Sequence, residues 1–327
     1  MKTLVLTSDP HGPSFRFRVG QYLPHLRRLG WCVDTAAVNG SLPQRLTALA
    51  RGRHYECVWL HRVLLTPVEH ALLRAAAPRY VFEFDDAVDR RDSNAPAFAS
   101  RQRRARFARM VRGATRVVAG NAYLAGLAAE CGREAAVLPT AVDVSAFPLL
   151  PAADEPPTIG WIGTRSNFVY LRSVLPALAR AAERRPDLRL LVVSDGVFEA
   201  GAVPVCNKRW SLAEEAADLA RMNVGIMPLP DDPWTRGKCG AKLLQYFAAA
   251  RPAVCSPVGA AREIVEHGVS GYLAATEKEW AERLLELLDD ASKRRRFGAA
   301  GRARVERDYS LEAVLPRLIA ELQAASR

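Results

Sequence analysis

Short β-rich runs alternate with helical stretches along the whole chain, and this alternation constrains the fold more than any other feature. Such a succession is typical of parallel sheets built from strand–helix–strand units. In the first half the predicted strands are Thr3–Thr7, Cys32–Val38, Cys57–Leu60, Tyr80–Phe84, Arg116–Ala119 and Ala136–Leu138. The predicted helices between them are Phe17–Leu29, Pro67–Ala77, Phe98–Val111 and Ala122–Glu130. The sequence therefore predicts an α/β fold.

A proline-rich stretch divides the alternation into two parts. Four prolines crowd residues 147–158, which excludes a helix interior there. Beyond it, the predicted strands are Thr158–Ile162, Arg189–Val193, Val203–Cys206, Asn223–Met227 and Ala253–Ser256. From Trp280 onwards we expect helices that are broken near Gly298 and Asp308.

The length of 327 residues suits two domains of roughly 150 residues each. We therefore expect two Rossmann-like domains, residues 1–147 and 158–327, joined by a linker at 148–157. The last helix is then able to pack back on the first domain. Open parallel sheets bind ligands beyond the carboxyl ends of their strands, so two such domains predict a cleft with two ligand-binding walls.

Net charge and hydropathy indicate which partners and which cellular location to expect. The formal net charge is +11, and residues 1–150 hold 21 Lys+Arg against 12 Asp+Glu, a net of +9. This basic half favours an anionic partner such as phosphate or an acidic lipid surface. No apolar run reaches the roughly 20 residues that span a bilayer, and the apolar start is too short for a signal peptide, so we expect a cytoplasmic protein. The six cysteines contain no C-x-x-C pair, and no zinc or redox motif is predicted.

The segment from Asp231 to Glu266 combines glycines, lysines and the start of a helix after a predicted strand. Gly237 and Gly240 flank Lys238, and a helix is expected to begin near Ala241. A loop of this kind leaves backbone N–H groups unpaired at the positive end of the helix dipole, where phosphate binds readily. Lys238 and Lys242 are four residues apart and are expected to converge on one anion. The alternative is a solvated, charged turn.

The run from Lys238 to Tyr246, with Arg251-Pro252 and Gly259-x-x-x-Glu263 after it, resembles the donor-binding region of retaining GT-B glycosyltransferases of family 4, the group 1 family. The resemblance implies phosphate contacts for Lys238 and Lys242. It assigns donor-binding positions to Cys239, Gly240, Ala241, Gln245 and Glu263. Gln245 stands where the family usually has a ribose-binding Glu, and the usual Glu near position 237–238 is also absent. These departures leave room for an inactive member.

The resemblance extends over nearly the whole chain. The stretch Ile159–Arg165 is similar to the family's first strand and glycine turn in the donor domain, where Gly163 would let the backbone approach a diphosphate. Arg165 lies near a basic position that assists departure of the leaving group in the family. A surface arginine that caps a loop is the alternative for Arg165.

Candidate acceptor-side residues lie in the first half. Residues 82–87, FEFDDA, resemble a segment of a subgroup of these transferases, and Asp85 or Asp86 is expected to contact an acceptor hydroxyl or a sugar. A loop or helix cap is the alternative role for both. Arg62 follows a predicted strand and could pair with either carboxylate. Ser14 is a plausible helix N-cap, and Arg16 rather than Arg18 is taken as the phosphate or acceptor contact. His11 and His61 are read as structural.

An arginine-rich amphipathic helix is expected over Ser100–Arg112. A solvated face and a peripheral contact with anionic lipid are both open, whereas nucleic-acid binding is not expected because no binding motif is present.

These observations predict a transferase that moves a sugar from a nucleotide-diphosphate sugar to a carbohydrate or lipid-linked acceptor. Arg165, Lys238 and Lys242 would stabilise the leaving diphosphate, with Asp85 on the acceptor side and no metal required. The resemblance implies retention of configuration. The alternatives are a non-catalytic nucleotide-sugar-binding homologue, a membrane-surface partner of another transferase, and a nucleotide-sugar epimerase.

Overall fold

The computed structural model describes residues 1–150 and 156–326, and the chain forms two compact units. The first contains Met1–Ala141, Arg236–Cys239 and Leu311–Arg327, and the second contains Val142–Thr235 and Gly240–Ser310. The predicted boundaries at 147 and 158 differ from this division because prolines mark where helices stop, whereas packing partners decide which unit a segment joins. Of the predicted linker 148–157, residues 151–155 lie outside the described part of the chain.

The first unit is built on a six-stranded parallel sheet with the order β2-β1-β3-β4-β5-β6. Its strands are β1 (Lys2–Thr7), β2 (Cys32–Ala37), β3 (Cys57–His61), β4 (Tyr80–Phe84), β5 (Arg116–Ala119) and β6 (Ala136–Val137). All five residues of β3 and of β4 are buried, which is typical of central parallel strands covered on both faces. The strands predicted in this half are thus confirmed to within one residue at each end.

The helices of the first unit are α1 (Pro13–Arg18), α2 (Leu23–Arg28), α3 (Leu42–Ala50), α4 (Pro67–Ala76), α5 (Arg101–Gly113), α6 (Ala122–Ala129) and α14 (Leu311–Ser326), with 3-10 turns η1 (Gly20–Tyr22) and η2 (Arg51–His54). The single helix predicted over Phe17–Leu29 is wrong: it is divided at Val19, whose backbone φ of −133° leaves the helical region. Pro24 then starts α2, where its missing N–H costs nothing. The helix α3 was not expected.

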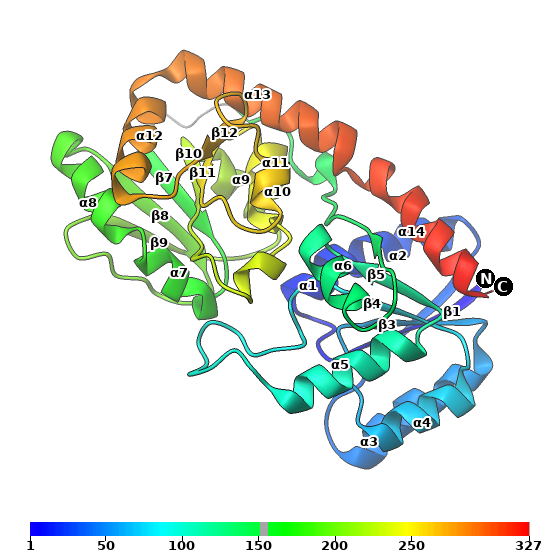
Figure 1. Ribbon diagram of the computed structural model, residues 1–327. Helices are drawn as coiled ribbons and strands as arrows, with labels where there is room; N and C mark the ends of the chain where they lie inside the picture. Colours follow the sequence, from blue (N-terminus) through cyan, green and yellow to red (C-terminus); the bar gives the residue numbers. More distant parts are fainter. Residues whose placement is uncertain (151–155, 327) are drawn as a thin grey trace. The chain divides into compact units, whose positions relative to one another are not determined.

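Helices cover both faces of this sheet, with α3, α4 and α5 on one face and α2 and α14 on the other (Figure 1). The core beneath α14 contains Val5, Trp59 and Val81 from the strands and Leu26 from α2. From α14 itself, Leu311, Val314, Leu318 and Leu322 are almost fully buried. A helix that follows the second unit in sequence therefore completes the core of the first.

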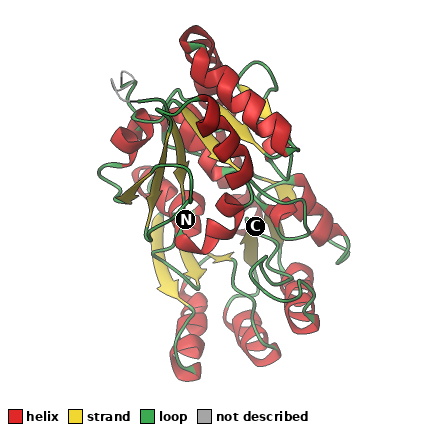
Figure 2. Cartoon of the chain, turned by 90° about the vertical axis from the view of Figure 1, so that its left-hand side faces the viewer, coloured by secondary structure: helices red, strands yellow, loops and turns green. Residues whose placement is uncertain are grey.

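The second unit has a sheet of the same kind, with the order β12-β11-β10-β7-β8-β9. Its strands are β7 (Thr158–Ile162), β8 (Arg189–Ser194), β9 (Val205–Arg209), β10 (Val224–Met227), β11 (Ala253–Cys255) and β12 (Gly271–Leu273). Its helices are α7 (Phe168–Arg172), α8 (Leu175–Arg184), α9 (Glu215–Ala220), α10 (Ala241–Ala248), α11 (Ala261–Ile264), α12 (Glu277–Asp289) and α13 (Ala291–Asp308), with 3-10 turns η3 (Val144–Ala146), η4 (Arg165–Asn167) and η5 (Thr235–Gly237), the last running into the first unit. Figure 2 shows the strands of each sheet in yellow with helices in red beside them.

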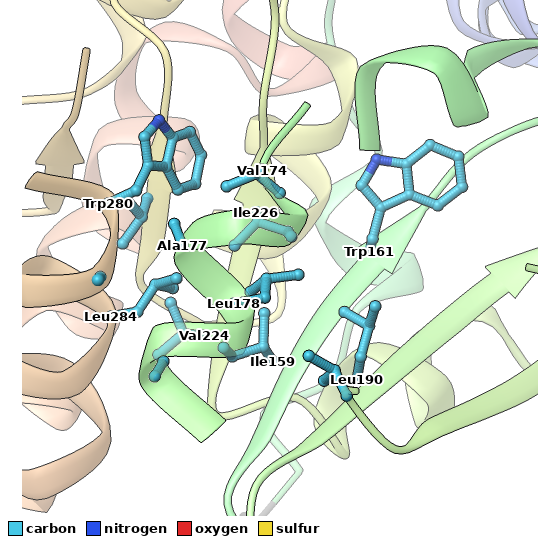
Figure 3. Packing of buried hydrophobic residues seen from close by; sticks show 14 of the residues in the cluster. Ile159, Trp161, Val174, Ala177, Leu178, Leu190, Val224, Ile226, Trp280 and Leu284 are labelled. Carbon is cyan, nitrogen blue, oxygen red and sulfur yellow. The ribbon is translucent and has the colours of Figure 1, made fainter. Parts of the chain in front are cut away.

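The core of the second unit forms where α8 and α12 pack together against the sheet. Ala177 and Leu178 from α8 lie beside Trp280 and Leu284 from α12, next to Ile159 of β7 (Figure 3). All five side chains are at least nine-tenths buried. This packing holds the strand β7 from which the candidate donor loop begins.

One expectation for the second half is wrong, and one strand was not predicted. The helix break at Gly298 does not occur: α13 runs through it, and the break lies at Asp290, whose side chain caps α13. Glycine is required at 298 because the helix passes close to another backbone, not because the helix ends. The short strand β12 was missed because its three residues carry too little pattern.

We expect Gly298→Ala to destabilise the second unit by about 1–3 kcal/mol. A methyl group at residue 298 would lie 2.1 Å from the carbonyl oxygen of Ala250, and backbone cannot move aside as a flexible side chain can. Gly126→Ala in α6 is the matched control, because nothing lies within 4 Å of its added methyl, and it should stabilise the chain by about 0.5–1 kcal/mol. Urea unfolding measures both, and equal effects of the two variants would contradict the prediction.

Candidate active site

Two loops meet at the carboxyl ends of β7 and β8 in the second unit. Gly163 follows β7 and donates its N–H to Val193 of β8 at 3.0 Å. The backbone N–H of Arg165 donates to the Asp195 carboxylate at 2.6 Å, which ties the loop after β7 to the loop after β8. The Arg165 side chain is exposed at this edge. A parallel sheet binds ligands at such an edge, so this is the first candidate surface for a donor.

A glycine in each of these loops makes room for a basic side chain. The Lys242 side chain passes over Gly163, where a methyl group would come within 2.8 Å of its Cε, and its Nζ lies 5.4 Å from the centre of the Trp161 ring. In the neighbouring loop, a methyl group on Gly196 would come within 2.9 Å of Arg165 Cδ. The two glycines therefore leave room for the Lys242 and Arg165 side chains at this edge.

We expect Gly163→Ala to weaken binding of a nucleoside diphosphate about tenfold, because the added methyl would lie 2.7 Å from the Trp161 ring and 2.8 Å from Lys242 Cε, so that the Lys242 side chain must shift and lose part of a charge-assisted contact. The rise in melting temperature that the ligand produces is the measurement. Gly126→Ala, far in sequence from this loop, should bind as the wild type does. Unchanged binding by Gly163→Ala would contradict the role given to the Lys242 position.

The helix α10 begins at this site with a glycine in a conformation that other residues rarely adopt. Gly240 is the N-cap with φ +71° and ψ +20°, and Ala241 and Lys242 form the first turn. The N–H groups of a first helical turn and the positive end of the helix dipole favour an anion. Lys238 lies outside the helix, so the helical four-residue spacing on which its convergence with Lys242 was predicted does not apply.

The other residues assigned to the donor side have different surroundings. Gln245 is on α10 and is only 4% exposed. Glu263 is exposed on α11, and its backbone carbonyl accepts from Arg304 at 2.6 Å. The roles given to both stay predictions.

The first unit contains a second cluster of polar side chains, centred on a glutamate within an apolar strand. Glu83 of β4 is 1% exposed. One carboxylate oxygen accepts from Arg18 Nε at 2.7 Å, and the other pairs with His61 Nδ1 at 2.5 Å. Arg18 Nη1 also donates to the Leu138 carbonyl at 2.9 Å. Burial opposes ionisation of Glu83, but the charges of Arg18 and His61 outweigh it and lower the pKa of Glu83 to about 2.

The two adjacent aspartates follow the end of β4, as expected. Arg62 pairs with both of them: its Nε lies 3.5 Å from Asp85 and its Nη2 lies 2.8 Å from Asp86. Arg62 has a left-handed backbone, with φ +61°, which is costly for a non-glycine residue. Burial opposes its charge, but Asp86 and Asp85 more than compensate and raise the pKa of Arg62. The expected pairing of Arg62 with either aspartate is thus confirmed.

Lys238 and Cys239 belong to the same unit as these aspartates. Lys238 Nζ lies 3.0 Å from an Asp86 oxygen, and the Cys239 thiol donates to the Asp85 carbonyl at 3.2 Å. Burial and the charge of Asp85 raise the pKa of Cys239 well above its usual value, so the thiol keeps its proton. Asn121 donates to the Lys238 carbonyl at 3.2 Å and fixes the segment. The predicted phosphate contact of Lys238 remains untested.

Sequence reasoning did not find the buried pair of Arg18 and Glu83, and the contact predicted for Arg16 stays a prediction. Arg16 lies over the ring of its neighbour Phe17 at 4.2 Å, whereas Arg18 is buried and binds Glu83. Ser14 is not the N-cap of α1, since Gly12 holds that position and Ser14 donates to Asp85. The charged residue Glu83 within the buried strand YVFEF was the available signal, because such a residue needs a buried partner.

Some arginines of helix α5 form ion pairs and hydrogen bonds within the first unit. Arg104 pairs with Asp89 at 3.0 Å and with Glu130 at 2.6 Å, and Arg112 donates to the Cys131 carbonyl. Arg101 and Arg103 are exposed. No helix of the described residues is long and apolar enough to cross a membrane. Residues 1–150 and 156–326 contain no group of three or more His, Cys, Asp or Glu side chains arranged to bind a metal ion.

Residues 156–290 match the family model described as "Glycosyl transferases group 1". Over 218 residues the chain is 29% identical to the GDP-mannose-dependent monoacylated α-(1-6)-phosphatidylinositol monomannoside mannosyltransferase of Corynebacterium glutamicum, covering 58% of this chain and 56% of that protein. It is 27% identical to the phosphatidyl-myo-inositol mannosyltransferase of Mycobacterium tuberculosis over 56% of this chain and 52% of that one. The chain spans about half the length of these curated relatives.

Solved structures match over almost the entire chain. A structure of Anabaena HepE in complex with UDP and glucose has a TM-score of 0.74 at 16% identity and covers 99% of both chains. The sucrose-phosphate synthase of Thermosynechococcus elongatus has a TM-score of 0.73 at 15% identity, covering 99% of this chain and all of that one. Residues 156–290 are therefore similar to a group 1 glycosyl transferase domain, and the chain as a whole has the α/β, two-unit GT-B fold.

Proposed function

We propose that this protein is a glycosyltransferase that moves a sugar from a nucleotide-diphosphate sugar to an acceptor hydroxyl. One observation carries the proposal: Lys242, the first turn of α10 and the glycine turn at Gly163 lie together at the carboxyl edge of the second sheet. This edge lies within the part of the chain that matches the group 1 family model. The matches to named mannosyltransferases support sugar transfer in glycan or glycolipid synthesis.

The proposed chemistry is activation of the donor by positive charge. As the bond between sugar and phosphate breaks, negative charge grows on the diphosphate. Lys242, Arg165 and the N–H groups of α10 would stabilise that charge, and fixed cations in place before the reaction contribute most to such catalysis. The predicted phosphate contact of Lys238 is kept as part of the proposal. Because these cations supply the charge, the proposal includes no metal, and the family resemblance supports retention of configuration and the FDDA subgroup.

The proposed acceptor is a carbohydrate or lipid-linked hydroxyl, and its side of the site includes Asp85, Asp86, Arg62 and Arg16. The Corynebacterium and Mycobacterium relatives carry phosphatidylinositol in their names, which supports a lipid-linked acceptor. A peripheral contact of α5 with anionic lipid at the cytoplasmic side of a membrane is the secondary part of this proposal. Flotation with anionic vesicles, with and without charge reversal at Arg101 and Arg103, measures this contact.

A non-catalytic homologue that binds a nucleotide-sugar is the second candidate, because Gln245 replaces the family's usual glutamate. Gln245 can still accept a hydrogen bond from a ribose hydroxyl, but it carries no charge. Such a homologue would bind the donor without transferring or hydrolysing its sugar.

The deciding experiment is a thermal-shift screen with nucleoside diphosphates and nucleotide-sugars, with and without Mg²⁺, followed by transfer of labelled sugar. GDP-mannose and UDP-glucose are the first donors to test, since a relative is GDP-mannose-dependent and the HepE complex contains UDP and glucose. A ligand at one hundred times its Kd adds about 2.7 kcal/mol of stability. A metal-independent shift with sugar turnover supports the transferase. A shift without turnover supports the non-catalytic homologue, and no shift with any donor overturns both.

A further inference from the structure

The carboxylate of Asp85 is held by a chain of hydrogen bonds that runs through the interior of the first unit. The hydroxyl of Ser14 donates to both Asp85 oxygens, at 2.8 and 2.7 Å. Behind Ser14, His61 Nε2 lies 3.1 Å from the same hydroxyl oxygen. On its other side His61 pairs with Glu83, which Arg18 holds in turn, and all three residues are at most 2% exposed.

The position of the Ser14 hydroxyl proton shows which group donates in the hydrogen bond between Ser14 and Asp85. Ser14 has one hydroxyl proton, and the Asp85 carboxylate can only accept, so that proton lies toward Asp85. Behind it, His61 Nε2 lies next to the Ser14 oxygen and His61 Nδ1 lies next to a Glu83 oxygen. Ser14, His61 and Glu83 are connected as in a hydrolytic triad, but here the serine proton is directed at Asp85 and not at the imidazole. Ser14 is therefore a donor to Asp85 and not a nucleophile.

The two adjacent aspartates differ in how much of their charge is compensated. Asp86 contacts two cations at close range, Arg62 Nη2 at 2.8 Å and Lys238 Nζ at 3.0 Å. Asp85 receives a neutral hydroxyl, and its contact with Arg62 Nε is longer, at 3.5 Å. Their side chains are almost equally exposed, at 13% and 12%, so exposure does not distinguish them. Asp85 retains more of its negative charge for a substrate.

We infer that Asp85 is the carboxylate that receives the acceptor hydroxyl, that Ser14 with His61 behind it is a positioning residue for Asp85, and that Asp86 contributes to the acceptor side by anchoring Arg62 and Lys238. This inference rests on the proposed transferase function. It assigns the hydroxyl-binding role to one of two neighbouring carboxylates and gives a role to Ser14 and His61 that their positions in the sequence do not indicate.

The test compares single variants at the two aspartates with variants at Ser14. We expect Asp85→Asn to lower kcat/KM for the acceptor about 100-fold, within the range for loss of a positioned acid–base group. Asp86→Asn, which weakens the anchoring of Arg62 and Lys238, should lower the same kcat/KM about tenfold, a smaller loss than at Asp85. Ser14→Ala should lower kcat/KM about tenfold, whereas Ser14→Thr, which keeps the hydroxyl, should restore most of it. A purely structural serine would not be rescued selectively by a hydroxyl.

A second arm needs no activity and separates this inference from the proposed function. The melting temperatures of Ser14→Ala, Asp85→Asn and the double variant form a cycle, and residues that share a bond give shifts that do not add. Additive shifts overturn the inference. Non-additive shifts support the contact even if the wild type transfers no sugar, a result that overturns the proposed function instead. Equal losses of acceptor turnover at Asp85 and Asp86, or wild-type turnover by Ser14→Ala, also overturn the inference.

Discussion

Glu83→Gln is expected to destabilise the first unit by about 3–5 kcal/mol at neutral pH, the usual cost of removing one partner from a buried ion pair. Glutamine fills the same space, but it leaves Arg18 and His61 without the carboxylate that compensates their charge, and its amide nitrogen replaces the oxygen that faces one of the two groups. Glu321→Gln is the matched control, because that glutamate pairs with Arg116, which is 44% exposed. Surface pairs contribute about 0–1 kcal/mol. Urea unfolding measures both variants, and a loss below 1 kcal/mol for Glu83→Gln would contradict the prediction.

Ionisation of the Glu83 carboxylate makes the stability of the first unit depend on pH. The pKa of Glu83 falls from 4.5 to about 2 on folding, since Arg18 and His61 outweigh the effect of burial. A lowered pKa means that the native state favours the ionised form, so its contribution is fully present above about pH 4.5. That contribution is lost as the pH falls toward 2. Glu83→Gln should therefore lack this part of the acid dependence, which denaturation curves at several pH values would measure.

Lys242→Ala is expected to lower the rate of sugar transfer about 100- to 1,000-fold, the effect of removing one fixed group that stabilises charge in the transition state. Lys242 is in the first turn of α10, and its side chain lies across Gly163. Lys242→Arg keeps the charge and should recover part of the rate. Initial rates with labelled donor are the measurement.

A surface lysine provides the control for that prediction. Lys278 is 76% exposed and pairs only loosely with Glu282, at 3.8 Å. Lys278→Ala should leave transfer and stability as in the wild type. If Lys242→Ala transfers sugar as fast as Lys278→Ala, the donor-site assignment is wrong.

The sequence predicted the strands well because central parallel strands are continuous apolar runs. Tyr80–Phe84, Arg116–Ala119 and Thr158–Ile162 have the predicted bounds. Glycines were harder to interpret. Gly298 was taken as a helix break, but it lies inside α13 where Ala250 approaches, and such close packing between distant segments leaves no local pattern.

The donor side and the polar cluster of the first unit differ in how well their contacts can be predicted from the sequence. The donor side could be predicted because Gly163, Gly240 and Lys242 occupy local turns with recognisable residue types. The cluster in the first unit could not, because its bonds join residues 65 positions apart in Arg18–Glu83 and 71 apart in Ser14–Asp85. Only the presence of Glu83 in an apolar strand indicated that a buried partner existed, and it did not identify Arg18.

The contribution of α14 to the first core has a consequence for how the protein is made. Residues 1–141 leave the ribosome well before Leu311–Ser326 has been synthesised, so the sheet face beneath α14 stays uncovered while the second unit is translated. During that interval Trp59, Val81 and their neighbours form an exposed apolar surface that chaperones can recognise. The nascent first unit should therefore need protection from aggregation for longer than its place at the N-terminal side of the chain suggests.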